Sequence, residues 1–273
     1  MKGPLSAEGQ PEVNGPDGPL SAEGQLSAEG QSGLDGPPES PVQGARFPHE
    51  VLAVVLQVRN GSLHVLLWQR AEPPSEMTWA LPGGPLAEDE RLGTSLGHHL
   101  ATKVDLTDVA HMEQLETRSD PARDPRGRVL ATAYLALIAA GAEPCIPPDT
   151  AWHPVQDLPP TAFDHGSIAR SGRERLRAKL SYTNIGFALA PETFTIAQLR
   201  DIYAASVGHP ISATNLQRIL TRRCVIEATP AAARPTAAGG RPATLYRFAT
   251  RTLVVTNPFA AFRPPSLSPA ATR

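Results

Sequence analysis

The sequence predicts an α+β protein with two folded domains, and three observations support this. Two apolar β-rich runs, at 51–58 and 63–68, flank Asn60-Gly61, a strong hairpin signal. Farther along, helical patterns at 195–208 and 212–224 precede two short β runs. Both ends of the chain are instead polar and rich in Pro or Gly. A chain of 273 residues is long enough for two small domains.

The first predicted domain covers residues 48–160. After the hairpin, the stretch 80–106 begins as a strand, continues through a Gly-rich turn and becomes a helix. Leu92, Leu96, Leu100 and Val104 recur every four residues and predict the buried face of this helix. Residues 129–140 predict another strand, and Pro-rich punctuation at 144–160 closes the domain.

A helix predicted over 164–189, with Asp164 as N-cap, occupies the connecting segment 161–189. The second domain covers 190–251. Its first helix has Thr195 as N-cap and Gly208 as the stop, and its second helix starts at Ser212 or Thr214. Two β runs around an Arg-bearing loop follow. This is the outline of a winged helix-turn-helix.

Both tails are predicted to be disordered, at 1–47 and 252–273. The first contains two copies of "PLSAEGQ" and one of "LSAEGQ", which are too short for repeat units of about 20 residues. These copies are polar and punctuated by Gly and Pro, so the segment has too little apolar surface to bury, and it holds seven acidic residues against two basic ones.

Composition limits the possible functions. Only two cysteines occur, far apart, which argues against a disulfide scaffold or a cysteine zinc site. No apolar run reaches about 18 residues and no signal peptide is recognisable, so we expect a cytoplasmic protein without a membrane partner. Residues 188–251 contain eight arginines against three acidic residues, which favours a polyanionic partner.

The stretch "GGPLAEDERLGTSLGHHLATKVDL" resembles a degenerate Nudix box. Gly84 and Glu90 fall at the first two anchor positions. The positions at which the family pattern has Arg-Glu, Glu-Glu and Gly hold His98, His99, Thr102, Lys103 and Asp105. Positions 99, 102 and 103 share one helical face, where an active box would hold Mg²⁺ or Mn²⁺ through carboxylates. The sequence therefore predicts no metal site and no catalytic residues. His98 and His99 point about 100° apart and do not chelate one ion easily.

Two longer stretches, 114–138 and 163–220, are similar to Nudix-related transcriptional regulators of the NrtR type. The "RSDPARDPRGR" run and the pattern "FTIAQLRDIY" carry this resemblance. It implies a Nudix-like α/β/α sandwich followed by a C-terminal winged helix. It also implies a repressor of NAD biosynthesis and salvage genes that senses ADP-ribose. ADP-ribose would be an effector, and no cofactor is expected.

The expected ligand site lies around the Gly-rich turn. Arginine suits a bidentate grip on a pyrophosphate that no metal neutralises. Glycines allow the backbone to approach a ligand closely. The candidate contacts are Arg70, Trp79, Gly83, Gly84, Arg123 and Arg126. The arginines at 123–128 could instead belong to a solvated turn.

The second helix of the pair should enter the major groove of double-stranded operator DNA. Asn215, Gln217 and Arg218 can reach base edges, whereas Arg222 and Arg223 suit phosphates. Arg241 in the "GGRPA" loop is expected to reach the minor groove. We expect a homodimer on a palindromic operator, associated with the nucleoid.

Two alternatives stay open at this point. The first is a weak Nudix pyrophosphatase that acts on ADP-ribose-like nucleotides through Glu88, Asp89 or Glu90. The second is a Nudix-like module for protein interaction, with the basic domain as its docking surface. A DNA mobility shift and an ADP-ribose turnover assay separate these alternatives from the repressor.

Overall fold

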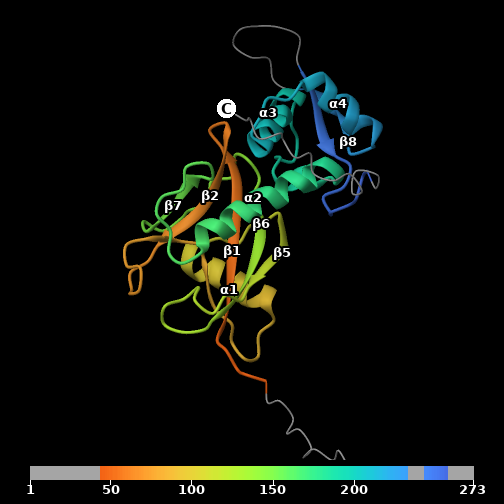
Figure 1. The fold of residues 1–273 in the computed structure, drawn as a ribbon. Coiled ribbons are helices and arrows are strands. Elements are labelled where there is room, and N and C mark those ends of the chain that lie inside the picture. The colour runs from red at the N-terminus through yellow and green to blue at the C-terminus, as the bar shows by residue number, and fades with distance from the viewer. Residues whose placement is uncertain (1–43, 233–242, 258–273) are drawn as a thin grey trace, which may run out of the picture. The chain divides into compact units, whose positions relative to one another are not determined.

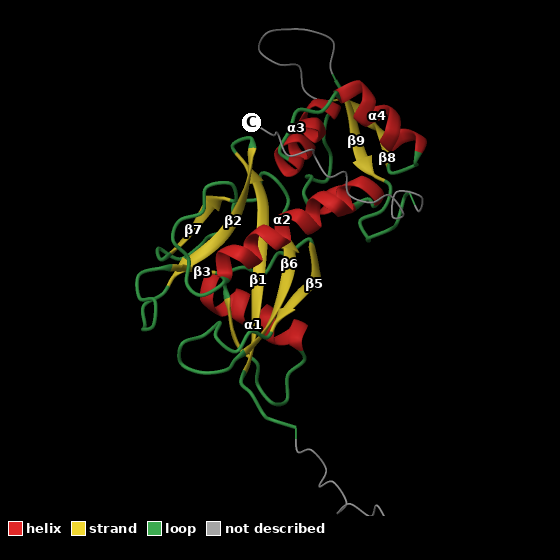
Figure 2. Ribbon diagram, in the orientation of Figure 1, coloured by secondary structure: helices red, strands yellow, loops and turns green. Residues whose placement is uncertain are grey.

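The first domain is built on a mixed β-sheet (Figures 1 and 2). The computed structural model describes residues 44–232 and 243–257. The sheet has the order β3-β2-β1-β6-β5, with β4 paired to β1 and β7 paired to β2. Only β1 and β6 run parallel. Its strands are β1 (His49–Arg59), β2 (Ser62–Gln69), β3 (Trp79–Ala80), β4 (Gly83–Pro85), β5 (His111–Arg118), β6 (Leu130–Leu137) and β7 (Thr150–Pro154).

The predicted Asn-Gly hairpin is confirmed. Asn60 and Gly61 have φ angles of 48° and 76° and connect β1 to β2, where Arg59 pairs with Ser62. Two consecutive positive φ angles define the type I′ turn, whose twist matches that of the flanking strands.

Helices cover both faces of the sheet, which confirms the α/β/α sandwich (Figure 2). Helix α1 (Leu92–Val104) buries the leucine face predicted from the sequence. Helix α2 (His165–Tyr182) packs on the opposite face. Strand β1 is buried on both sides because alternate residues face the two layers: Val51 and Val55 pack toward α1, whereas Leu52 and Leu56 pack toward α2.

The second domain is a helix-turn-helix followed by a hairpin. It contains the 3₁₀ helix η1 (Ile185–Ala188), α3 (Ile196–Val207), α4 (Ala213–Arg222), β8 (Ile226–Ala232) and β9 (Thr244–Phe248). Thr195 caps α3 through a capping box with Gln198, and Gly208 ends it at φ 81°. Ser212 is the N-cap of α4. Arg241 lies outside the described residues.

One apolar cluster extends from the sheet into the winged helix. It includes Leu56 and Leu67 of the sheet, Phe187 of η1, and Phe194 and Leu199 at α3. Phe187 and Phe194 are fully buried. The winged helix is therefore packed against the sandwich through shared core residues.

The connecting helix is shorter than predicted. It ends at Tyr182 because Thr183 takes an extended conformation, with φ −122° and ψ 175°. Residues 252–257, which we assigned to the disordered tail, instead contact this junction. Asn184 Nδ2 donates to the Thr252 carbonyl at 2.8 Å, and the Val254 N–H donates to Asn184 Oδ1 at 2.7 Å. Among the described residues, no helix is long and apolar enough to span a membrane.

Candidate functional site

A pocket of about 380 Å³ opens where the sheet meets the end of α1 and the start of α2. The Gly-rich β4 strand, the end of β2 and the turn after β5 all contribute to its wall. Its lining contains three cations, three aromatic rings and two carboxylates: Arg70, Lys103, Arg126, Trp68, Phe163, His165, Glu50 and Glu72. Such a mixture suits a flat ligand that carries negative charge.

Four of the six residues expected to bind a ligand line this pocket. They are Arg70, Gly83, Gly84 and Arg126. Trp79 does not line it, because its ring packs edge-on against His153 at 4.3 Å between centroids. Arg123 does not line it either.

Arg123 is a buried structural cation, which corrects its expected role as a ligand contact. Its side chain is only 2% exposed. One guanidinium nitrogen donates to Glu50 Oε1 at 2.6 Å and another to Asp164 Oδ1 at 2.9 Å. Both carboxylates come from distant parts of the chain. The sequence contained no local signal of this arrangement.

Arg70 and Arg126 converge on Phe163. Their guanidinium carbons lie 5.0 and 5.7 Å from the centroid of the Phe163 ring, within the range of a cation–π contact. The Arg126 side chain is also held by Asp124 at 2.6 Å, but it is still 55% exposed. Both guanidinium groups therefore contact the same aromatic ring. Sequence reasoning had not placed Phe163 in the site.

The helical face that would hold a metal in an active Nudix box has a different chemistry here. Lys103 Nζ donates to the Gly83 carbonyl at 2.7 Å and lies 5.0 Å from the Trp68 ring centroid. His99 Nε2 lies 2.9 Å from the Pro85 carbonyl oxygen, and the Thr102 hydroxyl donates to the His98 carbonyl at 2.8 Å. Burial, and then the charge of Arg70, lower the pKa of Lys103.

This donor set does not fit Mg²⁺ or Mn²⁺, which need several oxygen ligands. Over residues 44–232 and 243–257, no three His, Cys, Asp or Glu side chains form a group able to hold a metal ion. Lys103 instead places an ammonium at the wall of the pocket. A single fixed positive charge therefore stands where the box pattern would place a divalent ion.

The His99 ring packs closely over Gly84, so a side chain at position 84 would require this ring to move. A Cβ atom at position 84 would lie 2.5 Å from the His99 ring, closer than side-chain carbons approach one another. The histidine therefore covers the glycine turn and contacts its backbone. The histidine that replaces the glutamate of the Nudix pattern at position 99 therefore contacts the turn directly.

Glu90, the acid retained from the box, is paired with a neighbouring histidine. Its Oε1 lies 2.5 Å from His98 Nδ1. Interaction with the Ser95 side chain, and then with His98, lowers the pKa of the Glu90 carboxyl. Glu88 and Asp89 are exposed at the surface.

The residues at α4 that were expected to contact DNA differ in their exposure and in their hydrogen bonds. Asn215, Arg218 and Arg222 are exposed, and Arg218 donates to Asn215 Oδ1 at 2.7 Å. Gln217 is half-buried and donates to the Tyr246 hydroxyl at 2.8 Å, so it connects α4 to β9. Arg223 donates to the Ser181 carbonyl at the end of α2.

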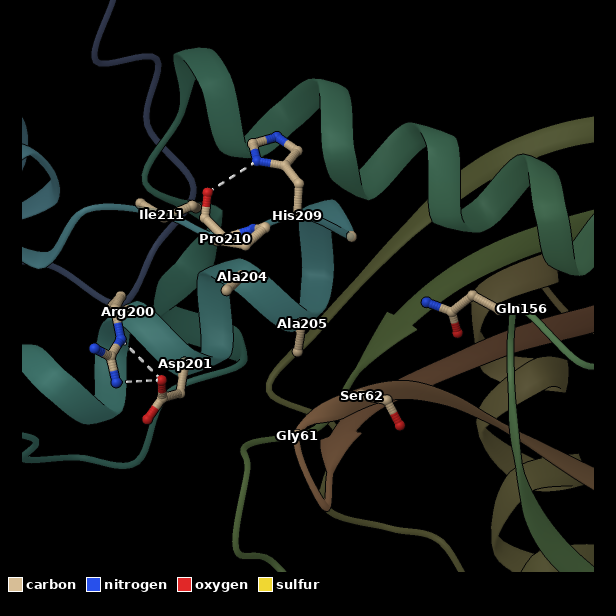
Figure 3. Close-up of a pocket in the computed structure, with 11 residues that line it drawn as sticks. Gly61, Ser62, Gln156, Arg200, Asp201, Ala204, Ala205, His209, Pro210 and Ile211 are labelled. Atoms are coloured by element: carbon tan, nitrogen blue, oxygen red, sulfur yellow. Dashed lines mark hydrogen bonds and ion pairs between the residues drawn. The ribbon is translucent and has the colours of Figure 1, made fainter.

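A second cavity, of about 590 Å³, lies between the β1–β2 hairpin and α3 (Figure 3). Gly61 and Ser62 border it from the sandwich, and His209 and Pro210 border it from the winged helix. The one ion pair drawn there joins the neighbours Arg200 and Asp201. None of the residues predicted to bind a ligand lines this cavity.

Known proteins resemble both domains. Residues 186–248 match the family model of the NrtR DNA-binding winged helix domain. The "ADPR responsive transcriptional repressor NtrR" of Acinetobacter baylyi is 32% identical over 220 residues, which cover 76% of this chain and 85% of the relative.

Solved structures agree with this similarity. Shewanella oneidensis NrtR, crystallised with a 27mer DNA, has a TM-score of 0.63 at 32% identity and covers 73% of this chain and 92% of its own. A MutT/nudix family protein from Enterococcus faecalis has a TM-score of 0.62 at 26% identity, covering 76% of this chain and 89% of its own.

A Nudix-like sandwich with an altered metal face, joined to a winged helix in one chain, defines a Nudix-related transcriptional regulator. The comparisons narrow this class further. The chain belongs to the NrtR family.

Proposed function

We propose that this protein represses genes of NAD biosynthesis and salvage by binding operator DNA, and that ADP-ribose in the sandwich pocket releases it. One observation carries the proposal. The pocket has three cations, one of which, Lys103, replaces a metal-binding acid of the box, and its domain shares an apolar core with the winged helix. A ligand bound there can therefore influence the DNA-reading helices through packed residues.

The pocket suits the diphosphate of ADP-ribose. Arg70, Lys103 and Arg126 supply positive charge without a metal, and guanidinium groups can hold phosphate oxygens through two hydrogen bonds each. Lys103 keeps further N–H donors besides the one that binds the Gly83 carbonyl. Trp68 offers apolar surface for a sugar or base.

The protein then binds ADP-ribose without cleaving it. Pyrophosphate hydrolysis at a Nudix box requires a bound cation to polarise the diphosphate and activate water. His99, Thr102 and Lys103 do not provide ligands for such an ion, and the Glu90 carboxylate is paired with His98. Among the described residues, Glu88, Asp89 and Glu90 belong to no group able to hold a metal ion, which favours binding over a weak pyrophosphatase.

DNA binding is assigned to α4. Arg218 and Asn215 are exposed and can reach base edges, whereas Arg222 can contact a phosphate. One helix of this length reads only a few bases. We propose a homodimer that binds two half-sites of a palindromic operator, as symmetry-related recognition helices do.

The route from pocket to DNA begins at α2. Phe163, which contacts both pocket arginines, comes two residues before the first residue of this helix. The other end of α2 contacts the winged helix through Arg223 and the Ser181 carbonyl. A shift of Phe163 on ligand binding would thus be transmitted along the helix.

The test measures both binding equilibria on one preparation. Operator affinity is followed by fluorescence anisotropy at fixed salt, with and without ADP-ribose. A coupling of about 1–3 kcal/mol should weaken operator binding by roughly 5- to 150-fold at saturation. Operator DNA must weaken ADP-ribose binding by the same factor, because coupling is reciprocal.

A control variant separates the two sites. Arg126→Ala should reduce the effect of ADP-ribose strongly and leave operator affinity in its absence unchanged, since residue 126 is exposed and far from α4 in the sequence. An unchanged operator affinity at saturating ADP-ribose would refute the proposed effector. If no nucleotide changes it, the sandwich serves only for assembly or protein interaction.

A further inference from the structure

The imidazole of His165 is buried at the wall of the pocket and has one nitrogen without a partner. The residue is 3% exposed, and it is the first residue of α2. The backbone N–H of Leu81 donates to its Nδ1 at 3.0 Å. Because Nδ1 accepts this bond, the neutral ring must carry its proton on Nε2.

Nε2 therefore carries the proton and acts as a hydrogen-bond donor. Within the described part of the chain, Nε2 has no hydrogen-bond partner although it is buried. A buried donor without an acceptor costs about 1–3 kcal/mol, and such groups in native proteins usually serve a purpose. The open space that His165 borders is the pocket, together with Leu81 and Phe163.

The ring stays uncharged over the physiological range. Burial lowers the pKa of His165 to about 3. The carboxylates of Asp164 and Asp124 oppose this shift, whereas the charges of Arg123 and Arg70 add to it. His165 thus adds no positive charge to the three cations of the pocket. An uncharged N–H group can donate to a sugar hydroxyl as well as to a phosphate, and the three cations of the pocket are already available for the phosphates.

We propose that the Nε2–H of His165 donates a hydrogen bond to a ribose hydroxyl of the ligand. This assignment rests on the proposed function, because it assumes that ADP-ribose is the ligand and assigns different residues to its diphosphate and to its sugar. Arg70, Lys103 and Arg126 hold the diphosphate, and His165 recognises a sugar. Because His165 stays neutral well above its pKa of about 3, its contact with the sugar does not change with pH near neutrality.

The substitution His165→Asn tests this contact. The amide oxygen of asparagine can take the position of Nδ1 and keep the Leu81 hydrogen bond, but its side chain is too short to replace Nε2. Calorimetric titration should show ADP-ribose binding weakened by about 2- to 10-fold, the range of one neutral hydrogen bond. Binding of inorganic pyrophosphate, which has no sugar, should be unchanged.

Nuclear magnetic resonance of the unaltered protein provides a second measurement that does not depend on the variant. Nitrogen-15 spectra of the histidine ring should show the Nε2–H form in the free protein. ADP-ribose should move the Hε2 resonance and slow its exchange with water, whereas millimolar pyrophosphate should do neither.

The outcomes separate this inference from the proposed function. Equal weakening of both ligands by His165→Asn, or an equal resonance shift, would assign His165 to the phosphates and overturn the sugar contact. An unchanged ADP-ribose affinity with an unmoved resonance would make the residue purely structural. If the unaltered protein does not bind ADP-ribose at all, the proposed function itself fails.

Discussion

Arg123 and Asp164 are joined by a hydrogen-bonded ion pair, with Nη2 and Oδ1 2.9 Å apart. Asp164 stands at the N-cap position of α2, but its side chain makes no capping hydrogen bond to the helix. Its carboxylate is instead directed to Arg123, which also binds Glu50 of β1. The pair therefore fixes the beginning of α2 to the edge of the sheet beside the pocket.

Arg123→Ala should destabilise the protein. The change leaves Glu50 and Asp164 without their shared cation, and these carboxylates are only about a fifth exposed. Removing one partner of a fully buried pair costs 3–5 kcal/mol, so about 2–3 kcal/mol is expected for these partly exposed acids. Urea unfolding measures the loss. Arg128→Ala, in the same turn but exposed, should change stability by less than about 0.5 kcal/mol; similar losses from both variants would contradict the structural role of Arg123.

Ligand binding should not depend on divalent metal ions but should depend on Lys103. We expect EDTA to leave ADP-ribose affinity unchanged. Lys103→Met should weaken it by about 10- to 100-fold, the range of a charged hydrogen bond. Thr102→Ala, on the same helix but outside the pocket lining, is the control. A requirement for Mg²⁺ would show that the altered face still holds an ion.

The same affinity should fall at alkaline pH. Burial lowers the pKa of Lys103, and binding needs its protonated form. Affinity is therefore retained below this lowered pKa and lost as the pH rises through it, earlier than for an exposed lysine with a pKa near 10.4. Titrations between pH 7 and 10 measure the effect, which should be absent in Lys103→Met. A profile that is identical in both proteins would assign the loss to another group.

Asp105→Gly should stabilise the protein. Residue 105 is the C-cap of α1 and lies in the left-handed region, with φ 50° and ψ 34°, where the Nudix pattern has glycine. Left-handed backbone costs an L-residue about 1 kcal/mol, and glycine avoids most of that cost. Thermal unfolding should show a higher Tm. A lower Tm would mean that the Asp105 side chain contributes more than the strain it causes.

Substitutions on α4 should separate base reading from phosphate binding. Arg218→Ala should reduce discrimination between operator and random DNA by about 1–3 kcal/mol. Arg222→Ala should weaken binding to both and lower the salt slope by about one unit. Affinities at three salt concentrations distinguish these effects. If both variants lose the same affinity for operator and for random DNA, the proposed orientation of α4 on the DNA is wrong.

Local signals in the sequence predicted most elements of the fold. The Asn-Gly pair specified the hairpin because both residues tolerate positive φ, and Thr195 and Gly208 marked the ends of α3 because their chemistry satisfies exposed backbone groups. The leucine repeat of α1 indicated its buried face. Each of these features depends on residues within a few positions of one another.

The candidate site was only partly predictable, because its contacts join distant residues. The arginines at 123 and 126 had the same local context, yet one is buried between Glu50 and Asp164 and the other borders the pocket. Gln217 was predicted to read bases, and its hydrogen bond to Tyr246, 29 positions away, could not be predicted from the sequence. The Leu81 N–H bonds to Nδ1 of His165 and thereby determines that the unpartnered Nε2 carries the proton, and this contact spans distant parts of the chain.

The apolar cluster that includes Leu56, Phe187 and Phe194 limits how this protein can be divided. A cut between the sandwich and the winged helix would expose aromatic side chains that are now completely enclosed. We therefore expect either half alone to be less stable than the intact chain, and a chimera made by exchanging winged helices would have to match the facing surface of the sheet as well. A substitution on one side of this cluster should disturb the packing of the other side, as within any single core.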